Sequence, residues 1–340
     1  MESKSNAERY KQRTDEIAEY IIDQMEQGLN NWKMPWHNGM KPAINQVTGK
    51  FFGGNNLMIL WYECLRNNYS ANRWATFKQW QKAGGKVRTF SKGTIVCYAI
   101  PQQRMISNSL NNEEEDDEGQ LEFDFLLSKH RKSKKKYHFR YLHEFNVDQV
   151  DNYDLNHPDL FVPVKSNREQ IDEFIRKTGA RIKNGSRALY NKQADYIEIP
   201  HKIKFTAGTD STAEENYYST LLHELIHWTA HPYRCNRPFG ERFGDKDYAF
   251  EELIAELGGA MLSTDFNQQV FPREDHARYL NDWLKVLKND FSFFTEALDL
   301  ARTAIFWLYK QTGLMSFDLK PQFERPVDEE RVEKWVEYLD

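Results

Sequence analysis

The stretch Leu221–Ala230 reads LLHELIHWTA, and it decides the fold expected for the C-terminal half of the chain. Side chains four residues apart lie on one face of a helix, so His223 and His227 can offer ring nitrogens to a single Zn²⁺. Glu224 flanks this pair, where a carboxylate can act as the base towards a metal-bound water. The pattern therefore predicts a zinc metallopeptidase site. The alternative is a chance match in a surface helix.

A catalytic zinc site also needs a third protein ligand, and a second expected helix offers carboxylates. This segment starts at Tyr248 and reads YAFEELIAELGGAML; Glu252 and Glu256 share a face, while Glu251 is rotated by about 100°. The run EELIAE resembles the ligand helix of the glutamate zincins (gluzincins), typified by thermolysin-like peptidases. That resemblance implies Glu252 as the metal ligand, Glu256 as the acceptor for His223, and Glu251 in a position usually held by asparagine.

Other residues compete for these roles. His231 lies four residues after His227 and is an alternative third ligand. Pro232 marks a helix end there, however, and three ligands at such steps on one straight helix diverge from a common point. Glu256 can instead be an ordinary helix carboxylate. The tyrosines that can either donate to an oxyanion or simply pack in the core are Tyr190, Tyr217 and Tyr218.

Periodicity and capping signals predict the secondary structure. Helices are expected over residues 6–28, 55–65, 76–83, 166–177, 213–230, 248–263 and 292–310. Strands are expected over residues 86–88, 93–100 and 195–199, and the alternating stretch 137–151 is expected to resume the first sheet. We expect residues 196–199 to form an edge strand on which an extended peptide lies. The small residues Gly258, Gly259 and Ala260 are expected to let the two metal-site helices approach closely.

Composition excludes several classes of protein. Three widely spaced cysteines indicate neither a disulfide framework nor a thiolate zinc finger. The N-terminus has no apolar signal segment and no run of about 18 apolar residues occurs, so export and membrane spanning are disfavoured. A cytoplasmic location is therefore expected. A chain of 340 residues is too long for one ordinary domain, and it fits two soluble domains of the α+β class.

The domain boundaries follow from changes in composition. We expect a first domain of mixed helices and strands over residues 1–155 and a zincin-like metallopeptidase domain over residues 156–312. Residues 313–340 form a C-terminal extension. Charge blocks such as NNEEEDDEG and KHRKSKKK indicate a solvent-exposed insertion at about residues 107–136, within the first domain.

The charge is unevenly distributed along the chain. Residues 27–106 contain eleven Lys and Arg residues against Glu63 alone, a net charge of +10. The remainder, with 35 basic and 50 acidic residues, carries −15. The first domain can therefore bind a polyanion that the rest of the chain would repel.

Five of the nine tryptophans, Trp32, Trp36, Trp61, Trp74 and Trp80, fall inside this basic stretch. Aromatic rings interleaved with cations suit single-stranded DNA, because unpaired bases stack on rings while phosphates meet Lys and Arg. Each ring can equally be a core residue. The candidate DNA-binding residues are Trp32, Trp36, Lys50, Arg73, Trp74, Lys78, Lys86, Arg88 and Lys92.

Taken together, these motifs resemble the ArdC antirestriction family of plasmids and phages. The resemblance rests on WKMPW, PAINQVTGKFFGGNN, WATFKQW, GGKVRTFSKG, FNVDQVD, ALYNKQADYIEIP, HELIHWTAHPYR and FEELIAELGGAML, in that order, within residues 8–312. It implies an N-terminal domain that binds single-stranded DNA, a C-terminal zincin-like domain, and interference with host restriction of incoming DNA. Similar N-terminal domains also accompany plasmid primases. The insertion and the C-terminal extension are not obvious features of the family.

The sequence thus predicts a protein in which capture of single-stranded DNA brings a Zn²⁺ peptidase near its target. A host restriction protein or another DNA-bound protein is the candidate target. Two alternatives remain: a non-proteolytic module that coats single-stranded DNA and uses zinc structurally, and an accessory of plasmid replication or priming.

Overall fold

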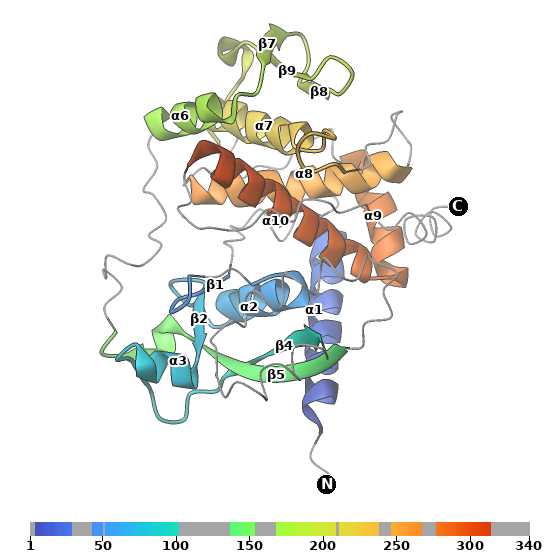
Figure 1. The fold of residues 1–340 in the computed structure, drawn as a ribbon. Helices are drawn as coiled ribbons and strands as arrows, with labels where there is room; N and C mark the ends of the chain where they lie inside the picture. Colours follow the sequence, from blue (N-terminus) through green and yellow to red (C-terminus); the bar gives the residue numbers. More distant parts are fainter. Residues whose placement is uncertain are drawn as a thin grey trace. The chain divides into compact units, whose positions relative to one another are not determined.

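The computed structural model describes residues 4–28, 43–49, 52–101, 137–153, 168–208, 211–237, 246–266 and 277–313. The chain divides into two compact units (Figure 1). The first comprises Met1–Tyr20 and Lys41–Val162, and the second comprises Ile21–Met40 and Pro163–Asp340. The expected insertion lies outside the described residues, as does the expected C-terminal extension beyond Gly313.

The first unit contains a four-stranded sheet in the order β1-β2-β5-β4. Its strands are β1 (Ile44–Asn45), β2 (Arg73–Thr76), β4 (Thr94–Pro101) and β5 (Tyr137–Asn146). β1 and β2 are parallel, and the other neighbours are antiparallel. The register of the long β4–β5 pair runs from Thr94 opposite Glu144 to Pro101 opposite Tyr137. The prediction that the chain resumes the sheet after the insertion is therefore confirmed.

Three helices belong to the N-terminal part of the chain: α1 (Asn6–Gly28), α2 (Gly54–Arg66) and α3 (Phe77–Lys82). The buried amide of Asn56 ties α2 to β4, since it donates to the Cys97 carbonyl at 2.8 Å and accepts from the Cys97 amide at 3.0 Å. α3 begins with a capping box between Thr76 and Gln79. A short pair, β3 (Lys86–Val87) with β6 (Val150–Asp151), lies beside the 3₁₀ turn η2 (Val147–Gln149).

The second unit contains a three-stranded sheet in the order β7-β9-β8. β9 (Tyr196–Pro200) pairs in parallel with β7 (Ile182–Gly185) and antiparallel with β8 (Leu189–Asn191). The expectation of an edge strand at residues 196–199 is therefore wrong, because β9 is hydrogen-bonded on both sides. The edges of this sheet are β7 and β8.

The described helices of this unit are α6 (Arg168–Thr178), α7 (Ala213–Trp228), α8 (Lys246–Asp265), α9 (Ala277–Asn289) and α10 (Ser292–Thr312), with the 3₁₀ turn η3 (Lys202–Lys204) before α7. α7 begins with a capping box between Thr212 and Glu215. Its residues 221–228 are buried, as are residues 249–264 of α8, so these two helices form the interior of the unit. In Figure 1, α7 (yellow), α8 (orange) and α10 (red) pack beside one another. None of the described helices has the length and apolarity to cross a membrane.

Two glycines of α8 let it approach α7 closely. A Cβ added at Gly259 would lie 3.2 Å from the His223 Cα atom, and one added at Gly258 would lie 2.9 Å from side-chain carbons of Ile226. A real side chain at either position would force the helices or their side chains to move. The expected role of these glycines is confirmed.

Candidate metal centre

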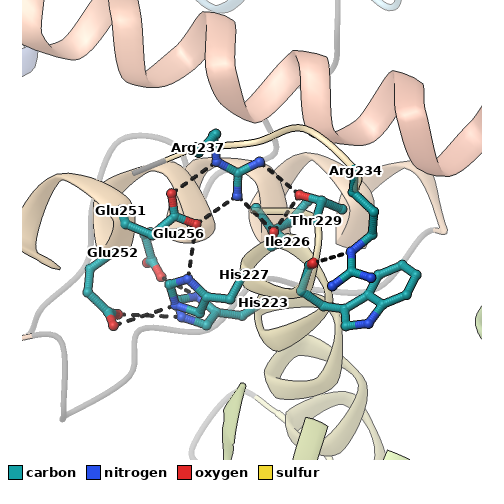
Figure 2. A network of polar contacts seen from close by, with 10 residues as sticks. His223, Ile226, His227, Thr229, Arg234, Arg237, Glu251, Glu252 and Glu256 are labelled. Carbon is teal, nitrogen blue, oxygen red and sulfur yellow. Dashed lines mark hydrogen bonds and ion pairs between the residues drawn. The ribbon is translucent and has the colours of Figure 1, made fainter. Parts of the chain in front are cut away.

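His223 and His227 on α7 face the carboxylate of Glu252 on α8 (Figure 2). The Nε2 atom of His223 lies 3.5 Å from one Glu252 oxygen, and the Nε2 atom of His227 lies 3.5 Å from the other. One ligand atom from each of the three residues lies within 4.8 Å of the others. All three are buried, with exposures of 4%, 4% and 6%.

This donor set fits a divalent ion of the zinc type. Two imidazole nitrogens and a carboxylate oxygen are the ligands of a catalytic zinc site with one open position. Donors bonded at about 2.1 Å to one tetrahedral ion are themselves roughly 3.4 Å apart, which matches the two 3.5 Å separations. These separations are longer than a direct N–H···O hydrogen bond.

The other nitrogen of each histidine faces a further carboxylate. The Nδ1 atom of His227 lies 3.2 Å from Glu251, and the Nδ1 atom of His223 lies 3.8 Å from Glu256. Carboxylates in this position orient a ligating imidazole and fix its tautomer. The structure thus places Glu256 beside His223, beyond hydrogen-bonding distance. Glu251 has the closer contact of the two, and its role for His227 was missed by the sequence reasoning.

Glu251 is itself held by a buried arginine, Arg237, in the loop after α7. The guanidinium donates to both Glu251 oxygens, at 3.0 and 2.7 Å. It also donates to the Thr229 hydroxyl at 2.8 Å and to the Ile226 carbonyl at 2.9 Å (Figure 2). Arg237 is 4% exposed, so the cation is fully engaged in fixing Glu251 against the end of α7.

Negative charge accumulates around the two histidines. Burial by itself lowers the pKa of His227, but the nearby carboxylates of Glu252, Glu251 and Glu224 outweigh it and raise that pKa to about 10. Burial favours the neutral form of Glu252, yet His227 and His223 hold its pKa well below the ordinary value. The carboxylates therefore favour positive charge between them, as a metal site requires.

Glu224 and Tyr248 complete the surroundings of the donor set. Glu224 follows His223 on α7 and is 3% exposed. Tyr248 lies one turn before Glu252 on α8; burial, the charge of Glu252 and a hydrogen bond to it raise the pKa of this phenol well above its ordinary value. Sequence reasoning did not single out Tyr248, although its four-residue spacing from Glu252 was a usable signal.

His231 lies apart from the three donors. It is partly exposed, its Nδ1 atom accepts from the Tyr233 amide at 3.3 Å, and its ring packs against Tyr233. The donor cluster found among the described residues does not include it. The structure thus groups Glu252, and not His231, with the two helix histidines.

Arg234 ties the end of α7 to the β8–β9 turn. It donates to the Trp228 carbonyl at 2.6 Å and its guanidinium lies 3.9 Å from the centre of the Trp228 ring. It also contacts the carboxylate of Asp195 and the Tyr190 hydroxyl at 3.1 Å.

The three candidate tyrosines each have a contact within the fold. Tyr190 donates to Asp195 at 3.0 Å, which gives that phenol a structural partner. Of the other two tyrosines, Tyr218 donates to Asp172 at 2.7 Å and Tyr217 packs against Phe205.

The candidate DNA-binding residues of the first unit divide by exposure. Lys78, Lys86, Arg88 and Lys92 are exposed, whereas Trp32, Trp36 and Lys50 lie outside the described residues. Arg73 is half-buried and donates to Gln46 at 2.8 Å.

The prediction for Trp74 needs correction. Its side chain is 0% exposed, and Trp61 and Trp80 are 2% and 0% exposed, so none of these rings offers a face to a base. They serve the core of the unit; the Trp80 indole, for example, donates to the Phe145 carbonyl at 2.9 Å. The sequence alone could not tell which of these tryptophans lie in the core and which on the surface, because a tryptophan between basic residues can occupy either place.

Comparison with known protein families agrees with both halves of the chain. Residues 11–147 match the model described as the N-terminal domain of anti-restriction factor ArdC, and residues 169–299 match the model of a zincin-like metallopeptidase. A Sinorhizobium fredii protein designated y4eC is 29% identical over 302 residues, which cover 87% of this chain and 91% of that protein. An Escherichia coli protein named DNA primase TraC is 30% identical over 300 residues, covering 86% of this chain but only 27% of that primase.

Solved structures extend the likeness to the whole fold. The metal-free antirestriction ArdC protein from plasmid R388 matches with a TM-score of 0.61 and 28% identity, covering 89% of this chain and 99% of that one. Its Mn(II)-bound form matches with a TM-score of 0.60 and 29% identity, covering 88% and 97%. A zincin-like domain and a metal-bound relative together support a divalent metal at the donor set.

The fold and the site define a two-domain α+β protein with a zincin-like metallopeptidase domain. The chain belongs to the ArdC-like family.

Proposed function

We propose that this protein is a Zn²⁺-dependent peptidase that binds single-stranded DNA and protects incoming plasmid or phage DNA from host restriction. The observation that carries the peptidase part is the convergence of His223, His227 and Glu252 within 4.8 Å, all buried, beside Glu224. Family membership and the primase relatives support a role associated with antirestriction or with plasmids.

His223, His227 and Glu252 would hold the ion. When bound, Zn²⁺ polarises a peptide carbonyl and lowers the pKa of water, so that a nucleophile forms near neutral pH. Glu224 takes the proton from the attacking water and passes it to the leaving amine. Glu251 orients the His227 imidazole through its Nδ1 atom, and Glu256 places a further carboxylate beside the Nδ1 atom of His223.

β8 is the edge strand best placed to bind the substrate backbone. It pairs with β9 on one side, and it packs against α7, which carries the two histidines. An extended peptide would add to this edge of the sheet as a further strand beside Leu189–Asn191. This assignment replaces residues 196–199, whose strand is central.

Metal content tests the donor set directly. We expect about one zinc per chain by elemental analysis of the wild type, and loss of that zinc in His223→Ala and in Glu252→Ala. His231→Ala is the matched control and should retain zinc. Retention of zinc in Glu252→Ala, or its loss in His231→Ala, would contradict the assignment of Glu252.

Glu224→Gln separates catalysis from metal binding, because the amide cannot take up the proton. This variant should retain zinc, bind single-stranded DNA like the wild type, and lose peptidase activity. If its protection of incoming DNA stays intact, the alternative function is favoured, in which the protein coats single-stranded DNA and zinc serves the fold.

A further inference from the structure

Phe90 combines two unfavourable features in one residue. Its side chain is 96% exposed, and its backbone has φ of +67°, in the left-handed region. It is the third residue of a turn closed by a hydrogen bond of 3.1 Å from the Ser91 amide to the Arg88 carbonyl. Glycine or asparagine normally occupies such a position, because a bulky side chain there is strained. A strained, exposed aromatic ring points to a function outside the fold itself.

Basic residues surround this turn. Lys86, Arg88 and Lys92 are all exposed. Two acidic residues lie beside Arg88: its guanidinium contacts the Asp151 carboxylate at 3.2 Å and the Asp148 carbonyl. Arg88 is thus partly neutralised by Asp151, whereas Lys86 and Lys92 form no ion pair with any of the described residues.

A second exposed ring, Phe77, is connected to this turn through Phe145 and Gly93. Phe77, at the start of α3, is 53% exposed and packs edge-on against Phe145 with ring centres 6.3 Å apart. The Phe145 ring packs against Gly93, where an added Cβ would be 2.9 Å from a ring carbon. Gly93 follows Phe90 by three positions, so their Cα atoms lie at most about 11 Å apart. The exposed Lys78 follows Phe77 on α3.

We propose that this surface binds the unpaired bases of single-stranded DNA, with Phe90 and Phe77 as stacking platforms and Lys78, Lys86 and Lys92 as phosphate contacts. The inference rests on the proposed DNA binding and names the residues that perform it. The physical argument is charge complementarity combined with exposed rings, since bases stack on aromatic faces in a sequence-tolerant way while cations meet the backbone. These residues replace the buried tryptophans as the aromatic component.

Substitutions of Phe90 separate stacking from folding. Phe90→Gly removes the ring and suits the left-handed backbone, so its unfolding midpoint should equal or exceed that of the wild type. Its affinity for a short oligothymidylate, measured by fluorescence anisotropy, should fall about tenfold. Phe90→Leu keeps an apolar side chain but has no aromatic face and should fall similarly, whereas Phe90→Trp should bind like the wild type.

An abasic oligodeoxynucleotide of the same length provides the matched ligand, because it keeps the phosphates and lacks the bases. The wild type and Phe90→Gly should bind it equally. Lys92→Gln should weaken binding to both ligands, and it should reduce the slope of log affinity against log salt concentration by about one, whereas Phe90→Gly should leave that slope unchanged.

The outcomes distinguish this inference from the function on which it rests. If the wild type binds oligothymidylate and Phe90→Gly, Phe77→Ala and their double variant bind it equally well, DNA binding stands and the stacking surface is wrong. If Phe90→Leu binds like the wild type while Phe90→Gly does not, the surface makes an apolar contact that is not base stacking, which overturns the inference. If the wild type itself fails to bind, both proposals fall.

Discussion

Arg237 donates hydrogen bonds to both carboxylate oxygens of Glu251, and each of these two side chains is only 1% exposed. Glu251 in turn lies 3.2 Å from the Nδ1 atom of His227, whose Nε2 atom faces Glu252. The arginine therefore acts on the metal centre through two intervening residues. It supplies the positive charge that pairs with Glu251 beside His227.

Breaking this pair should be strongly destabilising. Arg237→Met leaves the Glu251 charge buried without its partner, and we expect a loss of about 3–5 kcal/mol in the free energy of unfolding. Urea denaturation measures it. The double variant Arg237→Met with Glu251→Gln should recover much of that loss. Arg176→Met, which breaks an exposed pair with Glu173, is the control and should cost at most about 1 kcal/mol. An equal effect of the two arginine variants would contradict this account.

Gly259→Ala should weaken both the fold and the metal site. The added methyl would press on the His223 backbone, with 3.2 Å to its Cα atom, so α7 and α8 must separate where the ligands meet. We expect a loss of about 1–3 kcal/mol in the free energy of unfolding, together with lower zinc affinity in a competition titration. Gly258→Ala, which presses on the side chain of Ile226, is the matched variant and should lose stability while retaining zinc affinity. The same zinc affinity in both variants would argue against a role for the helix approach at His223.

Removal of the metal should lower the thermal unfolding midpoint of the second unit. An ion that binds only the folded chain stabilises it by mass action, and that contribution disappears with a chelator. We expect a lower midpoint after chelation and full recovery when zinc is added back. Glu252→Gln should show no response to either treatment. A chelated wild type with an unchanged midpoint would mean that no metal contributes to the fold.

Cys235 should make stability depend on alkaline pH. Burial, the largest cause, raises the pKa of its thiol from 9.0 to about 11, so the folded state binds this proton more tightly than the unfolded state. The resulting stability is fully present below about pH 9 and is lost as the pH rises towards 11. Urea midpoints across this range should therefore fall more steeply for the wild type than for Cys235→Ala. Parallel curves would contradict the assigned shift.

Local patterns predicted most helices of this protein. The periodic segments that were expected at residues 6–28 and 292–310 occur as Asn6–Gly28 and Ser292–Thr312, because burial of one apolar face and the capping residues act locally. α9 (Ala277–Asn289) was missed, although Leu280, Trp283 and Leu287 follow the same period and are buried. β7 was missed because its sequence IKNG has no strand signal of its own.

Long-range contacts explain what the sequence could not provide. The motif spacing predicted His223 and His227 as ligands, and the resemblance to the glutamate zincins implied Glu252. Arg237, by contrast, is joined to Glu251 only by the packing of a loop on α8. The position of β9 depends on its parallel partner β7, which comes earlier in the chain. The type of an aromatic residue also did not predict its exposure. Trp74, expected on the surface, is buried, while Phe90 is exposed on a turn that the sequence alone gave no reason to single out.

The pairing of Pro101 with Tyr137 marks a position at which the chain can be re-engineered. Because these two residues face each other across neighbouring antiparallel strands, the two positions that residues 102–136 connect lie next to each other in the sheet. A change in the length of a connection alters the entropy of closing it only slowly, by about 0.6 kcal/mol for each doubling. This position is therefore a natural junction for excision, for exchange with foreign sequence, or for new termini in a circular permutant, while the β4–β5 register stays intact.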